Sequence, residues 1–134
     1  MAHTKSLKKR YSNPSSSVFR ICIEAITKTP HNESAWNYLS GILMDTNEGG
    51  LTPTVWSFCT DLYQTSAKRR SPYLVSFMVD ALMENAEKRH NAQELEQAEQ
   101  LLQELMKIDP IRSNYWKYRM RALDTLKPTI VTNT

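Results

Sequence analysis

The chain has 134 residues, which predicts a single domain, and only three of them are glycines, which favours helices over a many-stranded sheet. The net charge of +3 is local, because Lys5, Lys8, Lys9 and Arg10 all lie in the first ten residues and the rest of the chain is close to neutral. A basic tail on a nearly neutral body is only weak evidence for nucleic-acid binding, and a solvated disordered tail is the preferred interpretation. The chain contains no apolar run long enough for a membrane span or a secretory signal, so a cytoplasmic protein is expected.

Composition divides the chain into three segments. Residues 1–17 are polar, basic and serine-rich, and are predicted to be a disordered or foreign leader. Residues 18–127 are predicted to form the folded domain, and residues 128–134 a disordered tail. Cys22 and Cys59 lie among apolar residues at helical spacing, which is typical of buried thiols in a reducing compartment.

Hydrophobic periodicity predicts two helices in the first third of the domain. The first covers about 18–29, with serines 15–17 as its cap and Pro30 as its end. The second begins at the N-cap Asn32, with Glu33 in its first turn. Their apolar faces are Val18, Phe19, Cys22, Ile23 and Ile26 for the first, and Ala35, Trp36, Leu39, Ile42 and Leu43 for the second.

The third and fourth predicted helices begin alike, each with a capping residue followed by proline, at Thr52-Pro53 and Ser71-Pro72. The loop between them carries the basic run Lys68, Arg69 and Arg70. The fourth helix is apolar over so much of its circumference that it is expected to be covered on two sides. Its apolar residues are Leu74, Val75, Phe77, Met78, Ala81 and Leu82.

The fifth predicted helix has Asn91 as its cap and Glu94 three residues later, a variant of the capping box. Its stripe is Leu95, Ala98, Leu101, Leu102, Leu105 and Ile108. The sixth helix is predicted to run from Asp109-Pro110 to Lys127-Pro128. Its apolar residues are Ile111, Tyr115, Trp116, Tyr118, Ala122, Leu123 and Leu126.

The second, fourth and sixth helices share a pattern at their starts. Pro30, Pro72 and Pro110 open or precede them at intervals of 42 and 38 residues, the period of a helical-hairpin solenoid. Trp36 and Trp116 each follow a proline by six residues, and each is interpreted as a core wedge that buries about 200 Å². The predicted fold class is therefore all-α, a stack of about six helices in antiparallel hairpins.

The stretch from Pro30 to Leu39 resembles a repeat motif of protein prenyltransferase α subunits, in particular the α subunit shared by farnesyltransferase and type I geranylgeranyltransferase. The motif is a proline followed by Asn-x-Ser-x-Trp, and its residues here are Pro30, Asn32, Ser34, Trp36, Asn37 and Tyr38. Two later segments agree in order and spacing. They are Ser71-Pro72-Tyr73-Leu74 with Asp80, and Ile111-Arg112 with Tyr115-Trp116-Lys117-Tyr118. In such repeats an arginine often lies three residues after the tryptophan. Arg119 keeps that position, whereas Leu39 replaces it after Trp36.

The resemblance covers about residues 18–126 and implies the C-terminal third of such a subunit. In this family an α subunit forms a crescent of hairpins around a β subunit, and the heterodimer transfers a farnesyl or geranylgeranyl group to a cysteine near the C-terminus of a protein. The resemblance implies that zinc lies on the β subunit, with magnesium as a further candidate cofactor, and that protein substrates bind through the complex. The chain itself is expected to hold no cofactor.

The family's α-subunit residues near the diphosphate come from earlier repeats, and no position here matches them. Lys68, Arg69 and Arg70 do not fit the family motif and are interpreted as a loop charge cluster. The leader departs from the family, which has another hairpin there. The chain is therefore expected to be a truncated product, an incomplete gene model or a degenerate copy, not catalytic by itself.

The side chains that carry metal or acid–base chemistry are scattered. The histidines are His3, His31 and His90, and no Cys-x-x-Cys pair occurs, so no metal site built by this chain alone is predicted. Asp80, Glu84 and Glu87 share a predicted helix, but Glu84 lies four residues before Lys88, as in a surface ion pair. No side chain has a recognisable catalytic context.

Two function classes compete with a prenyltransferase subunit. One is a free-standing helical-repeat adaptor that binds a protein partner, since three hairpins satisfy the minimum repeat number. Such a solenoid needs polar caps at both ends, which the first helix does not supply. The other is a basic nucleic-acid binder, which rests on residues 5–10 and 68–70 without a recognition motif.

Overall fold

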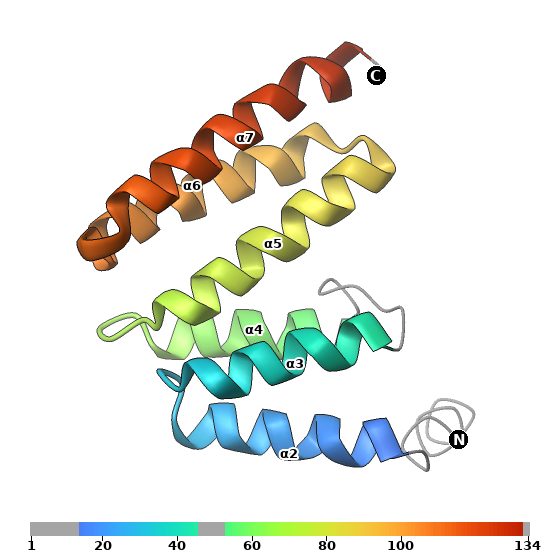
Figure 1. The fold of residues 1–134 in the computed structure, drawn as a ribbon, viewed down its shortest axis with the longest axis vertical. Coiled ribbons are helices and arrows are strands. Elements are labelled where there is room, and N and C mark those ends of the chain that lie inside the picture. The colour runs from blue at the N-terminus through green and yellow to red at the C-terminus, as the bar shows by residue number, and fades with distance from the viewer. Residues whose placement is uncertain (1–13, 46–52, 133–134) are drawn as a thin grey trace. The chain divides into compact units, whose positions relative to one another are not determined.

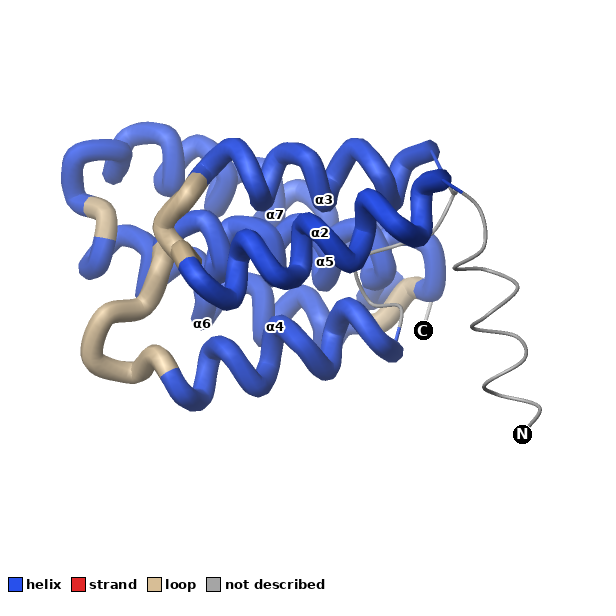
Figure 2. Tube along the Cα trace, turned by 90° about the horizontal axis from the view of Figure 1, so that it is seen from below, coloured by secondary structure: helices blue, strands red, loops and turns tan. Residues whose placement is uncertain are grey.

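The computed structural model describes residues 14–45 and 53–132, and within them every regular element is a helix (Figure 2). The chain divides into two compact units, Met1–Glu48 and Gly49–Thr134. The predicted fold class, all-α with helical hairpins, is confirmed. No helix among the described residues combines the length and apolar character that a membrane crossing requires.

The first unit is one helical hairpin. Helix α2 (Pro14–Lys28) and helix α3 (Glu33–Asp45) pack against each other (Figure 1). Asn32 caps α3 as predicted, because its side-chain oxygen accepts a hydrogen bond of 3.1 Å from the backbone N–H of Ser34. The buried side chains of the hairpin include Cys22, Ile26, Ala35, Trp36, Leu39, Ile42 and Leu43.

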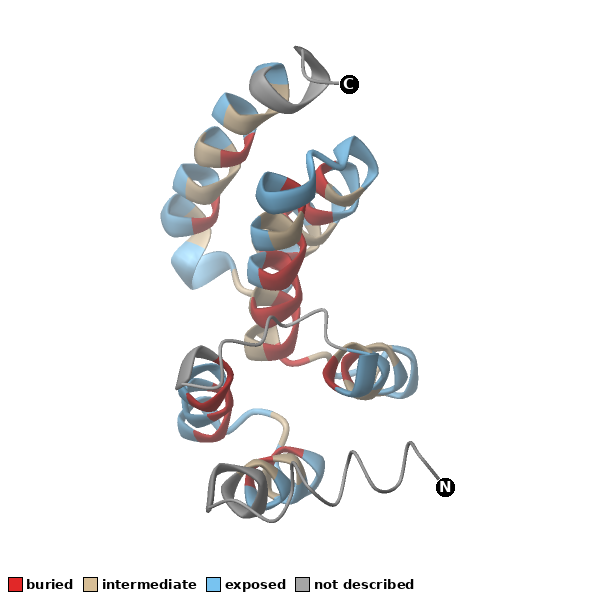
Figure 3. Cartoon of the chain, turned by 90° about the vertical axis from the view of Figure 1, so that its right-hand side faces the viewer, coloured by how far each residue is buried: buried red, intermediate tan, exposed pale blue. Residues whose placement is uncertain are grey.

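The second unit contains four α-helices and a short 3₁₀ turn. In chain order these are α4 (Pro53–Thr65), α5 (Pro72–Arg89), α6 (Ala92–Ile108), the 3₁₀ turn η1 (Pro110–Arg112) and α7 (Ser113–Thr132). Helix α5 packs on α4, α6 and α7, as expected for a helix with so wide an apolar surface (Figure 3). The core holds Val75, Val79, Leu82, Ala86, Leu95, Ala98, Leu102, Leu105, Trp116 and Leu123.

Local signals explain why α5 and α6 begin and end where they do. The buried hydroxyl of Ser71 accepts hydrogen bonds from the N–H groups of Tyr73 and Leu74 at 3.1 and 3.4 Å, and Asn91 caps α6 in the same way. His90 ends α5 in the left-handed conformation, with φ 53°. The chain therefore turns from α5 into α6 through two residues, which sets the two helices side by side.

The capping-box expectation for α6 is wrong. Glu94 does not reach back to its cap, because its carboxylate accepts a hydrogen bond of 2.6 Å from the side chain of Asn85. The N–H of Asn91 is already satisfied by the carbonyl of Ala86, at 3.2 Å, so it offers no donor to Glu94.

Two predicted helix ends are also wrong. Helix α2 begins at Pro14 rather than near residue 18, because proline suits the first helical position and the three serines lie in the first turn. Helix α7 continues through Pro128 to Thr132. The fixed φ of proline suits a helix, and the only backbone bond lost would go to the exposed Asp124. Residues 1–13 of the predicted leader and 133–134 of the predicted tail lie outside the described residues.

The sixth predicted helix begins differently and buries fewer side chains than its pattern indicated. Residues 110–112 form a 3₁₀ turn, and α7 begins after it. Trp116 and Leu123 are buried, but Ile111, Tyr115 and Tyr118 are exposed. The reason is that α7 rests on α6 and α5 along one stripe only, so residues beside that stripe remain in water.

Replacing Trp116 should remove the largest side chain from the core of the second unit. Trp116→Ala is expected to lower the free energy of unfolding by about 3–5 kcal/mol, because the indole is 2% exposed and packs in the core. The control Tyr118→Ala changes a side chain that is 59% exposed and should stay within about 0.5 kcal/mol. Urea unfolding followed by circular dichroism measures both, and equal effects would contradict this packing.

The buried thiols should be inert in the folded protein. Burial raises the pKa of Cys59 to about 12 and also raises that of Cys22. In the variant Cys22→Ser, the remaining thiol should react with a disulfide reagent at pH 8 only after denaturant is added. Because the raised pKa favours the protonated thiol in the folded state, Cys59 should contribute stability below pH 9.0 that is lost as the pH rises toward about 12. Labelling at the rate of an unfolded control would contradict the burial.

Candidate functional site

Both motif tryptophans hydrogen-bond to the turn that precedes their own helix. The indole N–H of Trp36 donates to the carbonyl of Pro30 at 2.8 Å. The indole N–H of Trp116 donates to a carboxylate oxygen of Asp109 at 3.2 Å. Because a buried indole needs a partner for its N–H, each tryptophan also holds the preceding turn in place.

The tyrosine two residues after each tryptophan is exposed to solvent, whereas the tryptophan is buried. Trp36 and Trp116 are 3% and 2% exposed, whereas Tyr38 and Tyr118 are both 59% exposed. Asn37, next to Trp36, is exposed as well. The shared motif therefore combines a buried anchor with an exposed tyrosine at equivalent places in two repeats.

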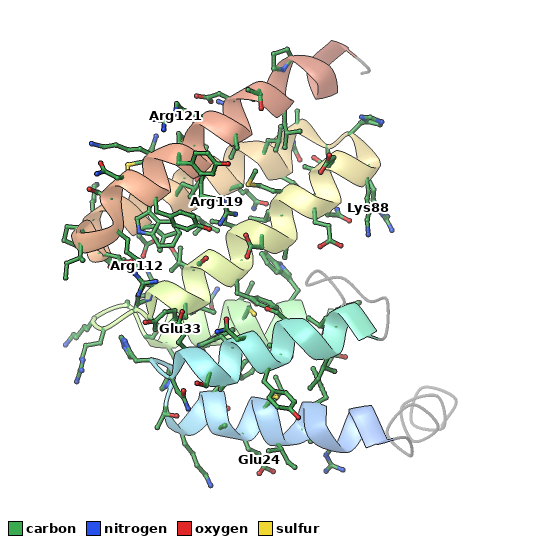
Figure 4. All side chains as sticks on the ribbon, viewed as in Figure 1. Glu24, Glu33, Lys88, Arg112, Arg119 and Arg121 are labelled. Atoms are coloured by element: carbon green, nitrogen blue, oxygen red, sulfur yellow. The ribbon has the colours of Figure 1, made fainter. Side chains whose placement is uncertain are left out.

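The arginine three residues after the second tryptophan joins α7 to α5. Arg119 forms an ion pair with Asp80, donates to the hydroxyl of Tyr115 at 3.4 Å and touches the sulfur of Met83. Figure 4 shows Arg119 between the two helices. Leu39, the residue at this place in the first repeat, is fully buried and apolar. Of the two repeats, the one in the second unit therefore has a polar side chain at this position that links two helices, and the one in the first unit has an apolar side chain.

Electrostatics keep this arginine charged. Burial by itself would lower the pKa of Arg119, but the negative charge of Asp80 and the hydrogen bonds that Arg119 donates to Tyr115 and Asp80 raise it. The guanidinium side chain is only 16% exposed, so the ion pair is shielded from water on one side. This pair positions α7 and is not free to bind an anion.

Arg112 in the 3₁₀ turn makes a second link, to the first turn of α5. Its guanidinium donates to the hydroxyl of Tyr73 at 3.0 Å and lies 5.2 Å from the centre of that ring. It also pairs with Asp109 at 3.3 Å, the carboxylate that accepts from Trp116. The residues that carried the resemblance in the second and third segments are therefore brought together in space.

A polar cluster on the opposite side of the second unit joins the end of α4 to α6. Arg70 donates to the carbonyl of Tyr63 at 2.6 and 3.1 Å and to Glu104 at 2.8 Å, and it stacks 3.5 Å from the centre of the Tyr63 ring. The hydroxyl of Tyr63 donates to the same carboxylate. Burial and Glu104 raise the pKa of Tyr63, whereas the charge of Arg70 lowers it by less.

The contacts of this cluster show which of the basic residues in the α4–α5 loop are already engaged within the protein. Arg70 is occupied by Tyr63 and Glu104 and is 15% exposed, so it cannot serve a diphosphate. Lys68 and Arg69 are exposed. The interpretation as a loop charge cluster accords with this arrangement, and Arg70 also closes the loop onto α6.

The cluster stands at one end of a groove of about 390 Å³ between α4 and α6, with α5 as its floor. The groove is lined by Trp56, Thr60, Tyr63, Met78, Leu82, Gln97, Gln100, Leu101 and Glu104. Its apolar floor and amide-bearing rim suit an uncharged or mixed ligand surface. The sequence pattern did not mark Trp56 as a residue that lines a groove, and it did not predict the polar cluster. Tyr63 and Glu104 are 41 positions apart and come together only when the helices pack.

The carboxylates considered from the sequence do not gather into a site. Asp80 pairs with Arg119, and Glu84 pairs with Lys88 at 3.0 Å, as the spacing predicted. Within the described residues, no group of three histidine, cysteine or acidic side chains is arranged to hold a metal ion. Cys22 and Cys59 are both buried and lie in different units.

The Arg119–Asp80 pair should be measurable as a coupling between α5 and α7. In a double-mutant cycle with Arg119→Leu and Asp80→Asn, we expect a coupling energy of about 0.5–1 kcal/mol, because Asp80 is 60% exposed and solvent weakens the attraction. The control cycle pairs Arg119→Leu with Glu87→Gln, an exposed acid on the same helix, and should show no coupling. Urea unfolding supplies the free energies, and a null result in the first cycle would contradict the geometry.

Comparison with known proteins agrees with the motif. No protein-family model matches the chain. Among curated proteins, it is similar to the protein farnesyltransferase/geranylgeranyltransferase type-1 subunit alpha of Arabidopsis thaliana, with 32% identity over 111 residues. The alignment covers 72% of this chain and 33% of the plant protein, so the chain spans about a third of its relative's length. This chain is therefore related, over the segment that aligns, to the α subunits of the protein farnesyltransferase and geranylgeranyltransferase type-1 family.

Proposed function

We propose that this chain is an α-subunit fragment that scaffolds the β subunit of a heterodimeric protein prenyltransferase. The complex would transfer a farnesyl or geranylgeranyl group to a cysteine near the C-terminus of a target protein. The observation that supports this most is the similarity to the plant α subunit. The motif residues of the sequence resemblance lie in helical hairpins in which Trp36 and Trp116 are buried.

The side chains of this chain suit positioning rather than bond making. The arginines that the motifs contribute are each committed to a neighbouring helix or turn, Arg112 to Tyr73 and Asp109, and Arg119 to Asp80. Because the described part of the chain gathers no three metal-ligating side chains, we assign zinc to the β subunit, where it would stabilise the acceptor thiolate. Magnesium, if used, would belong to the assembled complex. The free thiols accord with a cytoplasmic location.

A second candidate function is a helical-repeat adaptor that binds a protein segment without any transferase partner. The groove between α4 and α6 favours it, because it offers an apolar floor and a polar rim on a rigid helical surface. The two candidates differ in whether a β subunit is needed, and one binding experiment separates them.

The test is co-expression of the tagged chain with a farnesyltransferase β subunit and, separately, with a type I geranylgeranyltransferase β subunit. We expect a one-to-one complex with at least one of them on affinity and size-exclusion chromatography, and no prenyl transfer by the chain alone. A full-length plant α subunit serves as the positive control. If the folded chain fails to bind either β subunit at micromolar concentration while the control binds, the subunit proposal is wrong and the adaptor remains.

A further inference from the structure

Exposed apolar side chains are concentrated at the start of α7. Among the described residues, the exposed large hydrophobic side chains of the second unit all lie between residues 108 and 118. They are Ile108 at 38%, Ile111 at 95%, Tyr115 at 48% and Tyr118 at 59% exposure. Scattered single apolar residues need no explanation, but four of them within eleven consecutive residues, from the end of α6 through η1 into α7, indicate an interaction surface.

Three of these residues form one surface, which we call the Ile111 patch: Ile111, Tyr115 and Tyr118. Tyr115 and Tyr118 are three positions apart in α7 and therefore lie on one side of that helix, and Ile111 lies in the 3₁₀ turn η1 that leads directly into it. Tyr115 is held in place, since its ring packs 4.9 Å from that of Trp116 and its hydroxyl accepts from Arg119. The ring of Tyr115 is thus held in place before any partner binds.

The charge next to the patch that has no ion-pair partner is positive. Between Pro110 and Leu123 the sequence contains four basic residues and no acidic one. Arg112 and Arg119 are paired with Asp109 and Asp80. Lys117 and Arg121 are exposed, and no carboxylate among the described residues lies within ion-pairing distance of either. Figure 4 shows Arg121 on the side of α7 away from α5, opposite to Arg119.

We infer that the Ile111 patch, flanked by Lys117 and Arg121, docks an acidic segment of a protein partner, with an apolar side chain of that segment against Ile111 and Tyr118. Exposed tyrosine and arginine beside a fixed apolar residue are the composition of protein interfaces. Carboxylates on the partner would complement the two unpaired cations, which are one helical turn apart.

The number of unpaired cations disfavours two other anionic partners. Nucleic-acid binding draws most of its affinity from many phosphate contacts, and two cations supply few. Recognition of an anionic membrane surface needs a denser cluster of about four to eight basic residues. A protein segment needs only a pair of carboxylates and an anchor for the exposed apolar surface, which this patch provides.

The test measures binding of a short fluorescein-labelled peptide in which glutamates flank a leucine–tryptophan pair, by fluorescence anisotropy. Ile111→Ser should weaken binding at least about fivefold, and the double change Lys117→Glu with Arg121→Glu about tenfold, with the wild-type affinity falling as salt is raised. Matched controls are Ile21→Ser and Lys28→Glu, exposed residues of the first unit, which should leave binding unchanged.

All of these substitutions replace exposed side chains, so circular dichroism should show unchanged helix content for each variant. The inference is overturned if the wild-type chain does not bind the glutamate peptide, or if a peptide with lysines in place of glutamates binds equally well. It is also overturned if the patch variants bind as the wild type does, or if a single-stranded oligonucleotide or anionic vesicles bind and the peptide does not. No β subunit enters the assay, so its outcome is separate from that of the proposed heterodimer.

Discussion

Burial of an indole requires a hydrogen-bond partner for its N–H, and that requirement organises both repeats. Trp36 finds its partner in the carbonyl of Pro30, and Trp116 finds its partner in the carboxylate of Asp109. In both cases the acceptor belongs to the turn before the helix, so the same bond that allows the side chain to be buried also sets the angle at which the chain enters the helix. In a hairpin of this kind, a single tryptophan therefore fixes the turn that leads into the helix and also makes a contact in the core.

The second unit adds a layer of polar links around this core. Asp109 accepts from Trp116 and pairs with Arg112, which in turn reaches Tyr73 on α5, and Arg119 reaches Asp80 on the same helix. On the opposite side, Arg70 closes the α4–α5 loop onto Glu104 of α6. Charged groups used in this way stabilise the arrangement of helices and are no longer available to a substrate.

The surfaces that remain available are of two kinds. The groove over α5 is apolar at its floor and carries amides at its rim, whereas the Ile111 patch is apolar and tyrosine-rich with cations beside it. Their different chemistry suits different partners or different parts of one partner.

The sequence by itself determined the all-α class, the caps at Asn32, Ser71 and Asn91, and the buried tryptophans, because caps and apolar spacing act over one or two turns of helix. The ten-residue motif also indicated the family. Only the tertiary structure decided which polar residues meet. Arg119 and Asp80 are 39 positions apart, and Tyr63 and Glu104 are 41 apart, so no local pattern marks them as partners. The exposure of Ile111 and Tyr118 likewise could not be predicted from the sequence. It depends on which side of α7 is covered by α5 and α6, and only the packing of these helices decides that.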